Sequence, residues 1–317
     1  MMGHPRPNLF LIGSMKSGTS YLSALLAAHP EVFMCSPKEP CHFVDPKVLR
    51  KAWRAAWQLG YWRSVDRYLS LFAAAGDLPV IGEASTVYSQ APLFSGVPER
   101  ILEFSPNARF IYVMRDPVAR TISHYWHRVR WWGESRSLLS AIRSDARYTA
   151  VSYYARQLQA YLRCVECERV YVLTLEALLA DPAHQLSQLY RWLELDSSFQ
   201  PDAKDTASNA LPDIVEQRRG FGMLDRFRRT AVYRQVMPYL PRRVRRLGTR
   251  LAARPVRPAE VDTTDVRAFL RSLQQPQAAE LSRLLNRSFP EWTTLYEQEP
   301  EPFARAPVLK PQDSRTA

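Results

Sequence analysis

The strongest constraint on this chain is a short apolar run that passes through a glycine loop directly into a helical pattern. The segment begins at Leu9 and reads LFLIGSMKSGTSYLSALL. Residues 8–12 predict a buried strand, and residues 19–28 carry apolar side chains at helical spacing and stop before Pro30. A strand that enters a helix through so short a loop is typical of an α/β fold.

Further strands and helices alternate along the first part of the chain. The expected strands are 79–83, 109–114 and 169–175, and the expected helices are 118–131, 150–163 and 181–193. Strands separated by helices indicate a central parallel sheet that helices cover on both faces. After about residue 200 no strand pattern is convincing, and we expect helices over the arginine-rich segment and over 262–296.

The chain is long enough to bury a sizeable core. It has 317 residues, of which 46% are hydrophobic. We expect a single domain over 1–298, made of an α/β core (8–196) and a mainly helical extension (197–298). The prolines that follow Glu299 predict a disordered tail over 299–317.

The glycine loop has the composition of an anion-binding site. Backbone N–H groups of a tight turn and of a helix N-terminus converge there, and the helix dipole favours negative charge. Gly18 permits close approach, Lys16 adds a positive charge, and hydroxyl donors come from Ser17, Thr19 and Ser20. The order differs from that of a Walker A loop, in which the lysine follows the second glycine directly.

A second set of polar residues follows the strand at 109–114. Arg115 ends this strand, Asp116 and a proline open the next helix, and Ser123 lies further along it. Ligands of open α/β sheets bind beyond the carboxyl ends of the strands, so Arg115 should lie beside the glycine loop. A guanidinium and a hydroxyl that face one point suit a phosphate monoester. Taken alone, a structural ion pair of Arg115 would explain the same pattern.

These two stretches resemble the sulfotransferases that use 3′-phosphoadenosine 5′-phosphosulfate (PAPS). In that family a KSGT-type loop holds the 5′-phosphosulfate, and a strand-terminal Arg with a Ser in the next helix holds the 3′-phosphate. The matching positions are Lys16, Ser17, Gly18, Thr19, Ser20, Arg115 and Ser123. The resemblance implies a P-loop-like three-layer fold with a helical C-terminal extension, PAPS as the cofactor, and sulfuryl transfer as the reaction.

Other segments are similar to the carbohydrate branch of that family, which includes heparan sulfate enzymes and bacterial members. SPKEPCHFVD resembles the acceptor loop of this branch, in which Glu39 would be the catalytic base. His42 is the alternative base, because a neighbouring branch uses His. VIGEASTVYSQAP, SYYARQLQAYL and LLNRSFPEW resemble three further segments, the last of which ends in Trp292. This chain has Ala84 and Thr86 where the heparan enzymes carry Lys and Pro.

The resemblance also implies a mechanism. The acceptor attacks the sulfur in line, Lys16 stabilises the leaving oxygens, and Glu39 or His42 removes the proton of the acceptor hydroxyl. Arg115 distinguishes PAPS from nucleotides that lack a 3′-phosphate. We expect no metal ion, because sulfuryl transfer does not require one and the sequence shows no convincing carboxylate pair.

The positive charge of the chain is concentrated in one segment. The net charge is +12, and residues 216–257 hold 13 Arg, no Lys and 2 acidic residues. The segment can serve as a solvated surface, as a patch for an acidic substrate or for weak association with a membrane surface, or as part of a cofactor lid. For the lid, Arg218, Arg219 and Gly220 faintly resemble a family loop that closes over the 3′-phosphate.

Two other functions compete with sulfuryl transfer. A kinase-like P-loop phosphotransferase would need Walker A order and Mg²⁺ ligands, and neither is clear in the sequence. A non-enzymatic binder of nucleic acid or of an anionic surface would use residues 216–257, but no nucleic-acid module is recognisable. We therefore expect an enzyme with a carbohydrate or small-metabolite acceptor and no nucleic-acid partner.

The number of cysteines and the length of the apolar runs indicate where in the cell the protein is located. Cys35, Cys41, Cys164 and Cys167 are too few for a disulfide framework in a chain of this length. No export signal is readable, and the apolar runs are far shorter than the roughly 20 residues that span a bilayer. We expect reduced thiols and a cytoplasmic location.

Overall fold

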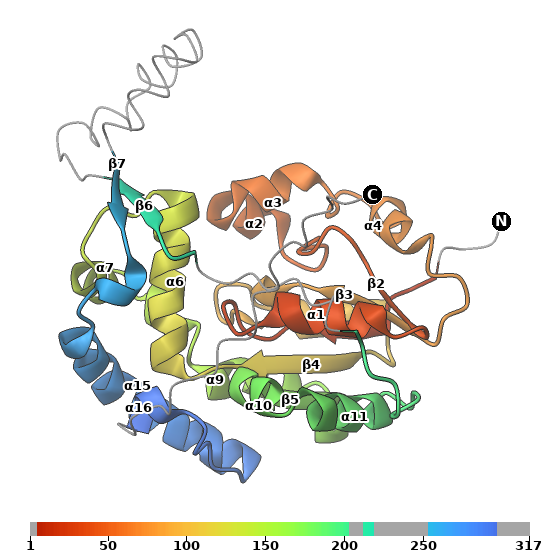
Figure 1. Cartoon of the computed structure of the whole chain (residues 1–317). Coiled ribbons are helices and arrows are strands. Elements are labelled where there is room, and N and C mark those ends of the chain that lie inside the picture. Colours follow the sequence, from red (N-terminus) through yellow and green to blue (C-terminus); the bar gives the residue numbers. More distant parts are fainter. Residues whose placement is uncertain (1–4, 203–211, 219–252, 297–317) are drawn as a thin grey trace, which may run out of the picture.

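The computed structural model describes residues 5–202, 212–218 and 253–296. At its centre is a five-stranded sheet in the order β2-β3-β1-β4-β5, in which every neighbouring pair is parallel (Figure 1). The strands are β1 (Leu9–Leu11), β2 (Val32–Met34), β3 (Val80–Ala84), β4 (Arg109–Met114) and β5 (Val170–Thr174). The predicted parallel sheet is confirmed, and β1, β3, β4 and β5 lie where the sequence placed them. The sequence does not predict β2, which is an edge strand of three residues with two half-buried side chains.

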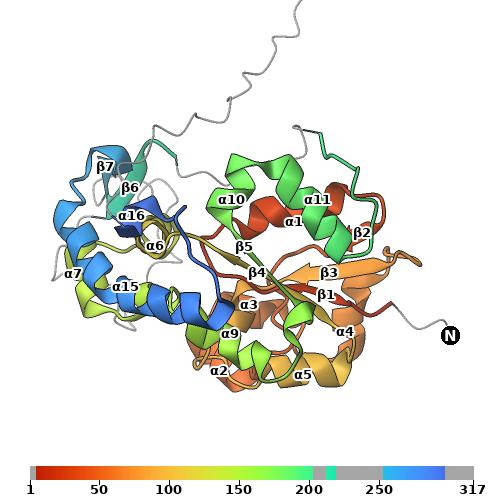
Figure 2. The ribbon, with the colours of Figure 1, turned by 90° about the horizontal axis from the view of Figure 1, so that it is seen from below.

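Helices cover both faces of the sheet (Figure 2). On one face lie α1 (Thr19–Ala28), α10 (Leu175–Ala180) and α11 (Pro182–Trp192). On the other lie α2 (Pro46–Ala52), α3 (Arg54–Leu59), α4 (Val65–Leu69), α5 (Val97–Phe104) and α9 (Tyr154–Leu162). Side chains of the strands alternate between the two faces, as the pleat requires. Leu11 packs in the core beneath α1, whereas Phe10 packs in the larger core on the opposite face.

A further group of helices stands beside the sheet (Figure 1). The helix α6 (Pro117–Trp132) follows β4 and contacts α7 (Leu138–Ser144), α8 (Arg147–Ala150), α15 (Thr264–Leu285) and α16 (Thr293–Tyr296). Short 3₁₀ turns are η1 (Ser70–Phe72), η2 (Thr86–Ser89), η3 (Cys167–Arg169) and η6 (Pro258–Glu260). The helical prediction for 262–296 is confirmed by α15 and α16. The helix predicted over 150–163 begins later than expected: α8 ends at Ala150, and α9 begins at Tyr154.

The prediction that no strand follows residue 200 is wrong. β6 (Val215–Arg218) pairs antiparallel with β7 (Ala253–Val256), and β6 packs on α6. The inward-facing side chains are Val215 and Gln217, and the amide of Gln217 donates to Tyr125 Oη at 2.8 Å. Because the inward-facing Gln217 is polar, the four-residue strand β6 shows no alternation of apolar and polar residues. β7 contains a proline, which is unusual within a strand and hides the pattern further.

Some predictions fall on residues that the structure does not describe. The helices expected between β6 and β7 lie outside the described residues, as does the tail predicted over 299–317. Within the described ranges, no helix combines the length and the apolar character that crossing a bilayer demands.

Trp292 is one of the residues that attach the C-terminal helices to the α/β core, beside the direct contacts of α15 with α6 and α9. Its side chain is fully buried and stacks on Phe289, with ring centroids 4.2 Å apart. The Trp292 ring also lies 5.8 Å from the ring of Tyr154 on α9. One aromatic side chain thus joins the end of α15 to the helix layer of the sheet.

We expect Trp292→Ala to lower the free energy of unfolding by about 3–5 kcal/mol, the usual cost of truncating a buried Trp. Urea unfolding followed by circular dichroism measures this loss. Trp131→Ala is the matched control, because Trp131 is 63% exposed, and it should change the free energy of unfolding by no more than about 0.5 kcal/mol. Equal losses in the two variants would contradict the attachment of the C-terminal helices through Trp292.

Candidate functional site

The glycine loop lies at the carboxyl end of β1 and is pressed against β4. The Ser14 N–H donates to the Val113 carbonyl at 2.9 Å, and a Cβ on Gly13 would lie 1.9 Å from Val113 N. Gly18 precedes α1 with φ of 85°, and a Cβ there would meet a leucine side chain at 2.5 Å. Glycine is therefore required for the close approach at one end of the loop and for the turn at the other. The result is a tight turn at a helix N-terminus, where free backbone N–H groups favour an anion.

Two hydroxyls of this loop are buried without a partner. Ser14 and Ser17 are both 0% exposed, and neither Oγ makes a hydrogen bond within the described residues. A buried polar group without a partner costs about 1–3 kcal/mol, so a ligand that bonds these hydroxyls is favoured. Of the other two predicted hydroxyls, Ser20 Oγ accepts from Lys38 Nζ at 3.0 Å and Thr19 Oγ1 lies 3.5 Å from the same nitrogen.

Positive charges gather around the loop. The Arg115 guanidinium lies 3.5 Å from the Lys16 carbonyl, so the structure brings these two predicted residues together. Burial lowers the pKa of Lys16, and the nearby charges of Arg115, Arg130 and Arg120 lower it further. These cations come from the loop, from the end of β4 and from α6. Bringing them together is unfavourable without an anion between them.

Arg120 is a member of this cluster that the sequence analysis did not single out. It is fully buried on α6, and its acceptors among the described residues are neutral: the hydroxyls of Ser152 (2.5 Å) and Thr121 (3.0 Å) and the carbonyls of Tyr148 and Met15, the latter at 3.5 Å. No carboxylate pairs with Arg120 among the described residues, and burial lowers its pKa to about 10. Arg120 lies one helical turn after Asp116, which caps α6. This spacing is the sequence signal that could have placed Arg120 on the inner face of the helix.

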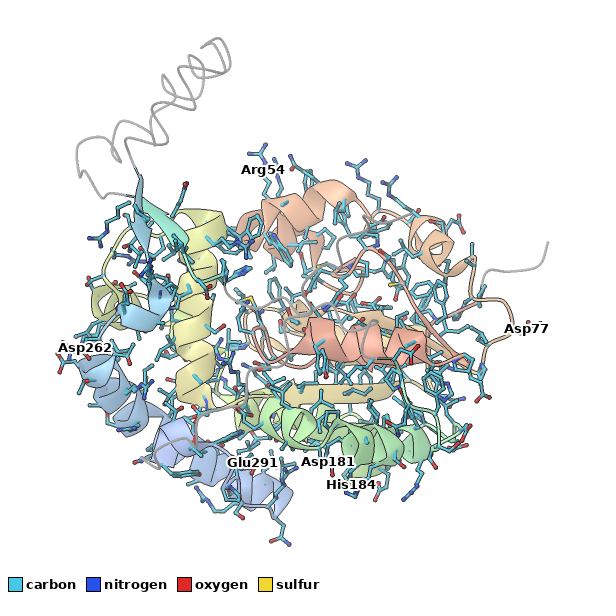
Figure 3. The ribbon with its side chains drawn as sticks, in the orientation of Figure 1. Arg54, Asp77, Asp181, His184, Asp262 and Glu291 are labelled. Atoms are coloured by element: carbon cyan, nitrogen blue, oxygen red, sulfur yellow. The ribbon has the colours of Figure 1, made fainter. Side chains whose placement is uncertain are left out.

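Some negative side chains lie far from the loop, whereas Asp116 and Glu176 lie close enough to Arg115 to interact with its charge. The labelled carboxylates Asp77, Asp181 and Asp262 lie on the outer surface, away from the region between α1 and α6 (Figure 3). Glu291, labelled at the lower edge, bonds Thr174 Oγ1 and Arg287 instead (Figure 3). These four carboxylates therefore lie apart from the cations of the loop.

The turn that carries Arg115 is held rigidly. Asp116 caps α6 by accepting from the backbone N–H groups of Val118 and Ala119, and its second oxygen accepts from Leu295 N at 2.8 Å. The Tyr154 hydroxyl donates to the Arg115 carbonyl at 2.7 Å. Arg115 itself forms no ion pair within the described ranges, so these residues do not supply the structural ion pair that was the alternative.

The remaining residues of α6 differ in exposure. Ser123 is half-buried in the second turn of the helix, and its hydroxyl makes no hydrogen bond with the residues that the structure describes. His124 is buried against Tyr148, and burial lowers its pKa to about 2. His127 is half-buried, and burial and the charge of Lys16 lower its pKa to about 4.

The predicted base Glu39 lies in the loop between β2 and α2. Its Oε1 accepts from the backbone N–H of Thr86 at 3.0 Å and from the Thr86 hydroxyl at 2.7 Å. Burial raises the pKa of Glu39, while the bonds from Thr86 and the charge of Lys38 act in the opposite direction. Glu39 has φ of 60°, an unusual backbone conformation for a residue other than glycine. Through Lys38, this loop is tied to the start of α1.

His42, the alternative base, is engaged in packing. Its Nδ1 lies 2.7 Å from the Tyr61 carbonyl, and its ring stacks on Tyr68 with centroids 4.2 Å apart. Burial lowers the pKa of His42. Between the two candidates, the geometry favours Glu39, because one ring face of His42 stacks on Tyr68 and its Nδ1 contacts a backbone carbonyl.

The candidate lid is only partly described. Arg218 ends β6, and Arg219 and Gly220 lie outside the described residues. The four cysteines are free thiols; Cys35 and Cys41 are buried near Glu83, which together with burial raises their pKa values.

A model of the sulfotransferase family matches residues 7–201, more than half of the chain. The chain belongs to the sulfotransferase family. The matched range contains the glycine loop, Glu39, Arg115 and the whole five-stranded sheet.

Two curated relatives illustrate the similarity within the sulfotransferase family. The membrane-associated sulfotransferase kil1 of Dictyostelium discoideum is 31% identical over 131 residues, which cover 41% of this chain and 25% of that protein. The heparan sulfate glucosamine 3-O-sulfotransferase 5 of Homo sapiens is 23% identical over 203 residues, which cover 60% of this chain and 54% of that protein. This chain thus spans between a quarter and about half of the length of these relatives.

A solved structure supports the sulfotransferase fold. The sulfotransferase from Alicyclobacillus acidocaldarius superposes with a TM-score of 0.66 at 24% identity, covering 91% of this chain and 99% of that one. The predicted three-layer fold with a central parallel sheet is therefore confirmed.

We expect pyrophosphate to stabilise the protein, because a small polyanion can offset the unpaired cations of the loop. A ligand present at 100 times its Kd adds about 2.7 kcal/mol to the free energy of unfolding, which a thermal shift detects. Lys16→Ala should lose most of this shift, whereas Lys47→Ala, at an exposed position on α2, should keep it. A shift that sodium chloride reproduces at equal ionic strength would contradict a built anion site.

Proposed function

We propose that this protein is a PAPS-dependent sulfotransferase that transfers the sulfuryl group to a hydroxyl or amine of an acceptor. The proposal is carried by the buried cations and unpaired hydroxyls that surround one glycine loop at the carboxyl edge of the sheet. PAPS presents a phosphosulfate on one side of its ribose and a phosphate on the other, so it offers anions both to the loop and to Arg115.

The chain's residues fit these two anions. The unpaired Ser14 and Ser17 hydroxyls, the Lys16 ammonium and the first N–H groups of α1 would hold the 5′-phosphosulfate. Arg115 and Ser123 would hold the 3′-phosphate, and the rigid turn around Asp116 would keep Arg115 in place for it. Arg120 would add to the positive charge that holds the 3′-phosphate.

When bound, PAPS supplies a sulfuryl group that passes to the acceptor oxygen and leaves adenosine 3′,5′-bisphosphate behind. Glu39 takes the proton that the acceptor hydroxyl loses as its oxygen bonds the sulfur. Burial makes Glu39 a stronger base than an exposed carboxylate. Lys16 offsets the negative charge that develops on the departing phosphate oxygen.

The acceptor class rests on the relatives. Relatives named for heparan sulfate glucosamine support a carbohydrate hydroxyl, and a small metabolite is the other class we expect. The cytoplasmic location, weak association with a membrane surface through residues 216–257 and closure of Arg218, Arg219 and Gly220 over the 3′-phosphate stay predictions.

We expect Lys16→Ala to lower turnover by about 10²–10³-fold, because it removes a donor to the leaving oxygens. Arg115→Ala should instead raise the KM for PAPS by roughly 10- to 150-fold with little change in kcat, because a charge-assisted contact is worth about 1.5–3 kcal/mol. Release of adenosine 3′,5′-bisphosphate from PAPS, with a panel of simple glycosides and phenols as acceptors, measures both quantities.

Arg54→Ala is the matched control for Arg115→Ala, since Arg54 projects from the outer side of α3 (Figure 3). It should leave both constants unchanged. Undiminished turnover in Lys16→Ala would refute the proposed mechanism.

A further inference from the structure

The two oxygens of the Glu39 carboxylate have different surroundings. Thr86, the first residue of η2, donates its backbone N–H (3.0 Å) and its hydroxyl (2.7 Å) to the same oxygen, Oε1. The other oxygen, Oε2, is buried and makes no hydrogen bond within the part of the chain that the structure describes. One oxygen is thus fixed by two donors, and the other is left without a partner.

The position of Thr86 follows from the end of β3. The strand ends at Ala84, whose carbonyl accepts from the Glu39 N–H at 2.9 Å, and the chain turns into η2 two residues later. On the opposite side, Lys38 donates to Ser20 at the start of α1. Glu39 is therefore held between η2 and the glycine loop, on the side where the donor nucleotide is proposed to bind.

Several charged and titratable groups act on Glu39. Lys38 and Cys41 belong to its own loop, and Glu83 is fully buried on β3, where burial raises its pKa to about 7. The Lys38 charge and the hydrogen bonds from Thr86 and the Val87 backbone favour the ionised form of Glu39, whereas burial disfavours it. Of these groups, Thr86 makes the closest contacts with the carboxylate, at 2.7 and 3.0 Å.

We propose that Thr86 is the positioning residue of the catalytic base: by holding Oε1 with two donors, it leaves Oε2 of Glu39 as the oxygen that removes the acceptor's proton. This inference rests on the proposed function. Two bonds to one oxygen fix the rotation of the carboxylate, and a fixed base can be aligned with the attacking hydroxyl. Thr86 does not itself touch the reacting atoms.

The test is Thr86→Val, which keeps the shape and the backbone N–H but removes the hydroxyl. A hydrogen bond to the ionised carboxylate lowers its pKa, so its loss should raise the pKa of Glu39 by about one unit, a tenfold effect. Carbon-13 NMR of protein labelled at the Glu carboxyl carbons reads this pKa directly, with the Glu39 signal assigned by its absence in Glu39→Gln. The acidic limb of kcat/KM for PAPS should move to higher pH by the same amount.

Thr86→Ser keeps the hydroxyl and should restore both values. Ser89→Ala is the matched control, because Ser89 lies in the same 3₁₀ turn with a buried hydroxyl that bonds the Thr86 carbonyl and not Glu39. If Thr86→Val does not fold, Thr86→Ala carries the same expectation.

Equal Glu39 pKa values and equal acidic limbs in Thr86→Val and Ser89→Ala would overturn the positioning role. Full activity of Glu39→Gln would also overturn the positioning role of Thr86, because Glu39 would then not be the base. The proposed PAPS site would not be affected by that result. Failure of the unsubstituted protein to bind adenosine 3′,5′-bisphosphate would instead contradict the proposed function itself.

Discussion

Buried positive charge without carboxylate partners is the constraint on which this site depends. Arg120 is fully buried among neutral acceptors, and it shares its surroundings with Lys16 and Arg115. Removing such charges from water costs several kcal/mol each unless an opposite charge is supplied. The described residues supply no carboxylate for Arg120, so an anionic ligand is the counter-charge that we propose, and its binding would stabilise the fold.

The parallel sheet brings the chemical groups together. In the order β3-β1-β4, three neighbouring strands end at one edge. The end of β1 continues into the loop with Lys16, the end of β4 carries Arg115, and the end of β3 leads to Thr86, which holds Glu39. The contact between Gly13 and Val113 draws the loop onto β4, so that the cations meet although they are far apart in the sequence. Each group is thus fixed by backbone structure, which suits a reaction that depends mainly on positioning and electrostatics.

Much of this architecture follows from local patterns in the sequence. The helix α1 has the predicted bounds, and Lys16 and Arg115 lie together because the strand–loop–helix pattern and the strand-terminal arginine are both local signals. The role of Arg120, the burial of His124 and the pairing of Thr86 with Glu39 depend on contacts between distant segments, which periodicity does not encode. β6 and β7 were missed for a similar reason: Gln217 is buried because it meets Tyr125 on α6, and nothing within its strand marks it as inward-facing.

The most direct test of the account is calorimetric binding of adenosine 3′,5′-bisphosphate without Mg²⁺, compared with ATP and adenosine 5′-phosphosulfate. The cation cluster predicts binding that requires the 3′-phosphate and weakens by roughly 10- to 150-fold when that phosphate is absent. Binding of ATP only in the presence of Mg²⁺, or no binding of the bisphosphate, would contradict the account.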